Sequence, residues 1–315
     1  MKSMTSAANP AIQLPKGMQV FERGWLSSNN ILCLDEDSAV LVDSGYLTHA
    51  NQTLALLQHA LDGRALSTLI NTHLHSDHCG GNALLQRTYG CRTLIPIADA
   101  AAVATWDEQV LTFDATAQKC ERFTFDGCIA PGDKLRMAGL DWQVMAAPGH
   151  DPHSMILYCA SEAILISADA LWEHGFGVIF PELIGESGFA EQADVLKLIS
   201  ELEVRLVIPG HGAPFSDVRG ALDRAHSRLA YLSADNGKHG RNARNALKAL
   251  IAFLLLDAQK FTLPDVAKHI QGSHVMRAAV AQIGTPVPLL VEQLMGELVS
   301  AGVAKMQGEY LMSSR

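Results

Sequence analysis

The chain has no stretch of apolar residues long enough to cross a lipid bilayer. Its longest apolar run is residues 249–256, whereas a membrane-spanning helix needs about 20 residues. The first thirty residues also lack the apolar segment that a secretory signal requires, and residues 1–17 are predicted to form a loose, polar leader. These absences predict a cytoplasmic protein that does not associate with membranes.

Paired cysteines and clustered positive charge are also missing. The six cysteines contain no CxxC pair, and a cytosolic chain keeps such thiols reduced, so we interpret them as small, buried apolar residues. The net charge of −9 opposes binding to a phosphate backbone, which depends on clustered Lys and Arg. The sequence therefore argues against nucleic acid as a partner.

What the sequence does contain is the composition of an ordinary folded protein, with 315 residues, 48% hydrophobic and 18% charged. Up to about residue 215, short β-branched runs alternate with helical stretches, which is typical of an α/β domain. We expect helices at 48–62, capped by Thr48, and at 190–203. Strands are expected at 38–45 (with a turn), 67–71, 91–97, 155–160, 163–169 and 205–210, and a hairpin at 134–149 that turns at Ala138-Gly139.

Beyond residue 216 the pattern becomes mostly helical. Helices are predicted at 217–234, 242–257, 262–270 and 288–302, with a break at 236–240. Two short strands then follow around Gln307-Gly308. A winged helix consists of three helices followed by a β-ribbon, and the elements beyond residue 241 come in this order. We therefore predict a winged-helix-like domain at 241–315, after a catalytic domain at 18–235.

The sharpest chemical signal is a cluster of His73, His75, Asp77 and His78, where a predicted strand ends and a Gly-Gly turn begins. Buried polar groups cost free energy unless they are paired or bind a metal, so we interpret the cluster as metal ligands. Alternate residues at a strand end point to the same side, so His73 and His75 can converge on one ion. Asp77 and His78 come after the turn and can face a second ion.

Three further candidate ligands each follow a predicted strand. They are His150 in APGHD, Asp169 in ISADAL and His211 in IPGHG. Strand ends on one rim of an open sheet are where α/β proteins build their sites, and the Pro-Gly before each histidine fits a tight turn. The complete set is five histidines and two aspartates.

This pattern, HxHxDH followed by His, Asp and His, resembles that of the metallo-β-lactamase superfamily over about residues 18–215. The resemblance implies an α/β fold, the αββα sandwich, followed here by a small, mostly helical, winged-helix-like region. It also implies how the ligands are shared: His73, His75 and His150 on one ion, Asp77, His78 and His211 on the other, and Asp169 bridging them.

A carboxylate at Asp43, in LVDSG, also matches a family position behind the ligand histidines. It would accept the second ring N–H of a ligand and fix its tautomer, and the alternative is a turn aspartate that caps the strand end. Two ions would share a water and present hydroxide at neutral pH, oriented by Asp77. No Ser or Cys nucleophile is then needed, so we interpret Cys79 as a packing residue. Zinc is the expected metal, with iron or manganese as alternatives.

Differences between this sequence and other branches of the superfamily narrow the range of expected substrates. The glyoxalase II-like branch, which cleaves thioesters and esters, keeps all seven ligands, so the resemblance implies a small ester or thioester. True β-lactamases generally lack an aspartate bridge. Homoserine-lactone hydrolases usually place a tyrosine between the positions of Asp169 and His211, and none occurs here, although a lactonase remains an alternative.

An apolar, Gly-containing segment at 172–189 follows Asp169 and has no clear period, so we expect a loop that forms a substrate wall. Its candidate substrate-binding residues are Trp172, His174, Phe176 and Phe180; the alternative is that these aromatics, and Phe189, pack under the site. His153 could touch substrate or be an ordinary loop residue.

The C-terminal region raises a second hypothesis, because a winged-helix-like tail resembles a subgroup that includes single-strand RNA endonucleases. Residues 287–302, the candidate recognition helix, contain Glu292 and Glu297 and no Lys or Arg. We therefore interpret the tail as a cap or a homodimerisation element and expect a small-molecule substrate. A noncatalytic, metal-stabilised binding module is a third hypothesis, disfavoured because these ligands leave positions open for water.

Overall fold

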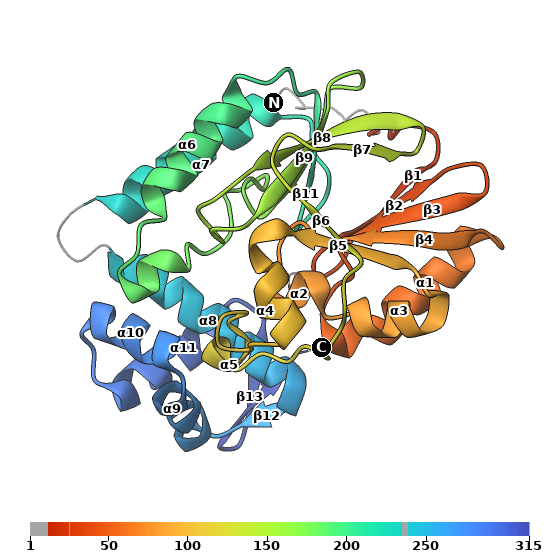
Figure 1. The fold of residues 1–315 in the computed structure, drawn as a ribbon. Coiled ribbons are helices and arrows are strands. Elements are labelled where there is room, and N and C mark those ends of the chain that lie inside the picture. The colour runs from red at the N-terminus through yellow and green to blue at the C-terminus, as the bar shows by residue number, and fades with distance from the viewer. Residues whose placement is uncertain (1–11, 25, 235–238, 315) are drawn as a thin grey trace, which may run out of the picture.

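Two β-sheets form the centre of the N-terminal region in the computed structural model, which describes residues 12–24, 26–234 and 239–314 (Figure 1). The first sheet has the order β1-β2-β3-β4-β5-β6 and is parallel from β3 to β6. Its strands are β1 (Met18–Phe21), β2 (Asn30–Leu34), β3 (Ser38–Val42), β4 (Ala65–Ile70), β5 (Arg92–Pro96) and β6 (Gly127–Ile129).

The second sheet has the order β11-β10-β9-β8-β7, and only its β10–β11 pair is parallel. Its strands are β7 (Lys134–Met137), β8 (Leu140–Ala146), β9 (Met155–Cys159), β10 (Ile164–Ala168) and β11 (Leu206–Pro209). The β7–β8 hairpin turns at Ala138 and Gly139, both at positive φ, as the sequence predicts.

Side-chain alternation along the strands decides how the layers pack. Val40 and Val42 contribute to the apolar core that the two sheets share, whereas Leu41 between them packs with residues of α1 (Ala50–Leu61) and α3 (Asn82–Tyr89). On β10, Ile164 faces the shared core, and Leu165 packs with α6 (Phe189–Ser200) and α7 (Val218–Ser233). The expected αββα sandwich is therefore confirmed.

The predicted helix cap at Thr48 is wrong. Thr48 lies inside a 3-10 turn, Leu47–His49, and α1 begins only at Ala50, with His49 at the N-cap. The residues between β4 and β6 also hold short helices that the sequence did not indicate. They are α2 (Ser76–Cys79), α3 (Asn82–Tyr89), α4 (Ala100–Thr105) and α5 (Phe113–Thr116), none of them long enough to show a clear helical period.

The C-terminal region contains four helices and a three-stranded sheet of order β12-β14-β13. Its elements are α8 (His239–Ala258), β12 (Lys260–Phe261), α9 (Leu263–Gly272), α10 (His274–Ile283), α11 (Val287–Ser300), β13 (Ala304–Gln307) and β14 (Tyr310–Ser313). The ribbon around Gln307-Gly308 is confirmed, whereas α10, between a Ser273 N-cap and Gly284, was not predicted. Residues 235–238, most of the predicted break, lie outside the described residues.

No helix in the described ranges combines the length and apolarity that crossing a bilayer would require. The run 249–256 belongs to α8, where most side chains are buried. A helix that is apolar on several faces is one that packs on several sides. In Figure 1, α8 runs between the sandwich and the rest of the C-terminal region.

Candidate metal centre

Strand ends carry all seven candidate ligands to one edge of the sandwich. His73 and His75 follow β4, with Asp77 and His78 on α2, while His150, Asp169 and His211 come after β8, β10 and β11. Their ligand atoms form three overlapping groups able to hold a metal ion, within each of which the atoms lie within 4.8 Å of one another. The groups are His73, His75 and His150; His73, His78 and Asp169; and Asp77, His78 and His211.

Three neutral imidazoles make up the first group. The Nδ1 atom of His75 lies 2.8 Å from the Nε2 atom of His150, and the buried Nε2 atom of His73 has no hydrogen-bond partner within the described part of the chain. Burial lowers the pKa of His75 and His150 to about 4 and that of His73 well below its ordinary value. At neutral pH these rings therefore have a lone pair available for a metal ion.

Asp169 lies between this group and the group of Asp77, His78 and His211. Its Oδ2 atom is 3.2 Å from His150 Nε2, while its Oδ1 atom is 3.4 Å from His78 Nε2 and 3.6 Å from His211 Nε2. Burial raises the pKa of Asp169, but the surrounding histidines outweigh this and hold it well below its usual range. The carboxylate is therefore anionic and faces both groups, as a bridging ligand would.

Asp77 completes the group that also contains His78 and His211. Its Oδ2 atom lies 3.2 Å from His211 Nε2, and Asp77 also lines the cavity next to the centre. Burial raises its pKa, but the hydrogen bond from His211 and the charge of His78 bring it below the ordinary value. An ionised Asp77 can therefore accept a hydrogen bond from a water in the cavity.

Behind His78 lies Asp43, at φ 59° directly after β3. Its Oδ2 atom is 2.8 Å from His78 Nδ1 and accepts from the Thr72 hydroxyl, while its Oδ1 atom accepts from the Thr72 backbone N–H. Burial alone would lower the pKa of His78, yet the Asp43 and Asp169 carboxylates raise it well above its ordinary value. This geometry orients the ring so that Nε2 points at the centre.

The Asp43→Asn substitution is expected to weaken metal binding by about 10- to 100-fold. The amide oxygen must face the Thr72 N–H, so the NH2 group would donate to His78 Nδ1 and leave the ring proton on Nε2, where the metal ion should bind. Metal affinity can be measured by competition with a fluorescent chelator. The Asp62→Asn substitution, at the exposed, positive-φ C-cap of α1, is the control. An unchanged affinity in the Asp43 variant would contradict the orienting role.

The cavity at the centre has a volume of about 70 Å³. One wall comes from the 172–189 loop, a second from the end of α5 and the residues that follow it, and a third from α8. Besides the candidate ligands His75, Asp77, His150, Asp169 and His211, it is lined by Thr116, Gln118, Trp172, Gly177, Val178, Phe180, Ala249 and Phe253. Trp172 Nε1 donates to Asp169 Oδ1 over 3.3 Å, and the Phe180 ring centre lies 5.1 Å from that of His75.

Two of the four candidate substrate-binding residues do not line this cavity. The His174 side chain is 80% exposed and lies near Glu173, whereas Phe176 is fully buried and packs in the core beneath α6 and α7, as does Phe189. His153 pairs with Asp99, 2.6 Å away, outside the cavity lining. Sequence could not separate these residues from Trp172 and Phe180, because a loop without a period does not show which side chains turn inward.

The wall residues Thr116, Gln118, Ala249 and Phe253 were missed by the sequence analysis. None lies near a ligand in sequence, and Phe253 belongs to a helix whose apolar run could be explained by core packing alone. Only a tertiary contact brings them to the site. Asp151, directly after His150, was also overlooked; its Oδ2 atom lies 3.5 Å from His75 Nε2.

Cys79 has the surroundings of a packing residue. Its side chain is buried, its Sγ atom lies 3.8 Å from Cys120 Sγ, and it is absent from the cavity lining. Burial raises the pKa of Cys79 well above that of a free thiol, so the thiolate that nucleophilic attack requires is disfavoured.

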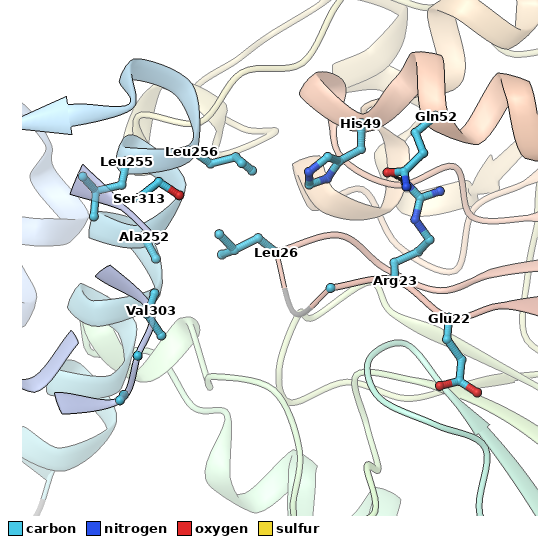
Figure 2. Close-up of a pocket in the computed structure, with 13 residues that line it drawn as sticks. Glu22, Arg23, Leu26, His49, Gln52, Ala252, Leu255, Leu256, Val303 and Ser313 are labelled. Carbon is cyan, nitrogen blue, oxygen red and sulfur yellow. Dashed lines mark hydrogen bonds between the residues drawn. The ribbon is translucent and has the colours of Figure 1, made fainter. Parts of the chain in front are cut away.

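A separate cavity of about 410 Å³ contains none of the candidate ligands. Figure 2 shows Arg23, His49 and Gln52 on one side of it, and Ala252 and Leu255 of α8 on the other. The Arg23 guanidinium donates to Asn30, Thr53 and Gln52, so its donors hold the first sheet and α1 together. We therefore place the chemistry in the smaller cavity.

Comparison with known proteins agrees with the geometry. Residues 23–211, which include all seven candidate ligands and Asp43, match the profile of the metallo-beta-lactamase superfamily. A hydroxyacylglutathione hydrolase from Chelativorans sp. (strain BNC1) is 28% identical over 206 residues, or 64% of this chain and 69% of that protein. Another from Nitrobacter winogradskyi is 29% identical over 119 residues, which span only 39% of that protein's length and 38% of this chain.

Solved structures share the fold. A metallo-beta-lactamase family protein from Thermus thermophilus superposes with a TM-score of 0.56 at 20% identity, covering 95% of this chain and 99% of that one. TTHA1623, solved in a di-iron-bound form, superposes with a TM-score of 0.53 at 24% identity and covers 66% of this chain and 98% of that one. The first match extends through the C-terminal region, so the likeness in fold is not limited to the sandwich.

Proposed function

Because the chain belongs to the metallo-β-lactamase superfamily, we propose that it is a hydrolase that holds two metal ions and cleaves a small ester or thioester. The observation that carries this proposal is the Asp169 carboxylate, whose two oxygens face two different groups of histidines. A single ion would need only one of these groups. The proposed ligands are His73, His75 and His150 for one ion, Asp77, His78 and His211 for the other, and Asp169 for both.

The donor atoms fit this assignment. The buried Nε2 atoms of His73 and His78 have no hydrogen-bond partner within the described residues, and an unsatisfied buried polar atom costs about 1–3 kcal/mol. Coordination of a metal ion would satisfy both nitrogens. Imidazole and carboxylate together suit zinc, which we propose, and also iron or manganese.

Bound metal ions would supply the Lewis acidity that activates water and polarises the carbonyl group of the substrate. The chain's own residues provide the geometry for the reaction. Asp77 accepts a hydrogen bond from the attacking water and so directs its lone pair at the carbonyl carbon. Asp43 holds the His78 proton on Nδ1, and Trp172 donates to Asp169 and keeps that carboxylate in place.

The walls of the cavity favour an acyl substrate. Val178, Phe180, Ala249 and Phe253 present apolar surface beside the candidate ligands. The relatives named hydroxyacylglutathione hydrolases act, by that name, on an acylated thiol, which supports an ester or thioester bond here. No tyrosine contributes to the cavity lining among the described residues, which weighs against the lactonase hypothesis.

Charge in the C-terminal region weighs against RNA. The Arg244 and Lys248 side chains of α8 both pair with Glu297 of α11, at 2.5 Å and 3.2 Å. These two basic groups thus share one carboxylate, which offsets half of their charge, and α11 contributes a second acidic residue, Glu292. Phosphate-backbone binding needs an uncompensated basic stripe.

A substrate panel tests the proposal directly. Metal-loaded protein should hydrolyse short acyl esters and thioesters at least ~10-fold more efficiently than lactones, phosphodiesters or single-stranded RNA, because only acyl groups match the apolar walls. The comparison is of kcat/KM under identical metal and salt conditions. Turnover of RNA but of no acyl substrate, together with steeply salt-dependent RNA binding, would replace the hydrolase assignment with the nuclease hypothesis.

A further inference from the structure

Helix α8 supplies a wall of the proposed active site, although it lies outside the matched family region. Ala249 and Phe253 are four residues apart, so they share one helical face, and both line the 70 Å³ cavity. Three other α8 residues, Ala252, Leu255 and Leu256, line the separate cavity in Figure 2. Among the described residues of α8, Ala249 and Phe253 are the ones that line the cavity beside the candidate ligands.

Hydrogen bonds fasten the C-terminal helices to the two loops that complete the cavity. Asn242 of α8 accepts from the Ile179 N–H and donates to the Ile179 carbonyl, and Gln282 of α10 donates to the carbonyls of Glu182 and Leu183. On the other side, the Ser273 hydroxyl donates to the Ala115 carbonyl, next to Thr116. The wall formed by α8 therefore keeps a defined position relative to the loops.

Phe253 itself is held firmly. Its side chain is buried and its ring centre lies 5.0 Å from that of Tyr46, in a tilted arrangement. The Tyr46 hydroxyl donates to Asp257 Oδ2 one helical turn further along α8, over 3.0 Å. Because Tyr46 is anchored in this way, Phe253 cannot swing aside to admit a larger group without breaking these contacts.

We propose that Phe253 sets the upper limit on the length of the acyl group and that the preferred acyl groups are short and uncharged, an inference that rests on the proposed esterase or thioesterase function. A cavity of about 70 Å³ is about half the volume of a ~150 Å³ cavity that can hold one benzene molecule, so it favours a short acyl group. No Lys or Arg lines it among the described residues, so no side chain offers a countercharge to an anionic acyl group.

The test compares Phe253→Ala with the unaltered, metal-loaded protein on a series of acyl esters from acetyl to octanoyl. For the unaltered protein, kcat/KM should fall at least ~10-fold beyond butanoyl, and a succinyl ester should be at least ~10-fold poorer than butanoyl. In Phe253→Ala the octanoyl-to-acetyl ratio should rise by ~10-fold or more. The matched control is Leu254→Ala, which removes a buried α8 side chain that packs in the C-terminal core instead of lining the cavity.

Binding measurements separate this inference from the proposed function. Calorimetry with the free carboxylic acids of the series should show the same length limit in the unaltered protein and its loss in Phe253→Ala. If no ester is hydrolysed but this binding pattern appears, the proposed function fails and the role of Phe253 stands. The milder Phe253→Leu variant is tested as well, in case Phe253→Ala does not fold. An unchanged preference for acyl length in both variants would overturn the inference.

Discussion

Asp169→Ala is expected to lower kcat/KM for the best acyl substrate by roughly three orders of magnitude, because it removes the one carboxylate that faces both groups of histidines. The loss should be mainly in kcat. Without the Asp169 carboxylate, no bridging ligand would fix the distance between the two ions. The site would also lose a negative charge that offsets the positive charge of the bound ions. Steady-state kinetics after metal loading, with elemental analysis of the same samples, measures both effects.

The control for this variant is Cys79→Ala, which alters a buried side chain next to His78 that does not line the cavity. Its kcat/KM should stay within about threefold of the unaltered value, as for a residue with no part in catalysis. Loss of turnover in Cys79→Ala at normal metal content would mean that the nucleophile has been assigned to the wrong group. Near-normal turnover in Asp169→Ala would remove the basis of the two-ion proposal.

Removal of metal by a chelator is expected to abolish hydrolysis completely, and addition of zinc, iron or manganese should restore it. The same treatment should lower Tm, because an ion present at 100 times its Kd stabilises the folded state by about 2.7 kcal/mol. Differential scanning calorimetry and elemental analysis measure the two quantities. The metal-loaded protein should contain two ions per chain.

A reproducible content of one ion per chain would contradict the dinuclear assignment while leaving the hydrolase assignment intact. Hydrolysis that persists in fully metal-free protein would contradict both. A stability gain on metal binding without any turnover would instead support the third hypothesis, a metal-stabilised binding module.

The positions of the candidate ligands could be predicted from the sequence because each depends on local structure. His73 and His75 follow a strand end at alternate positions, and His150, Asp169 and His211 each come within four residues of the end of a strand whose apolar run is visible in the sequence. Strands β8 and β10 are both antiparallel to β9, and β10 is parallel to β11, so these three strands run in the same direction and end at one edge of the sheet. The αββα layers were predictable for a related reason, since alternate residues such as Val40 and Leu41 face opposite sides of a sheet.

The substrate cavity, in contrast, was decided by the tertiary structure. An apolar side chain gives the same sequence signal whether it faces a core or an empty space, so Phe176, which packs beneath α6 and α7, could not be distinguished from Phe180, which lines the cavity. Phe253 comes to the site from a different region of the chain, through contacts of α8 with Tyr46 and Ile179. The candidate metal ligands are thus visible in the local sequence, because they follow strand ends, whereas long-range packing decides which side chains line the substrate cavity.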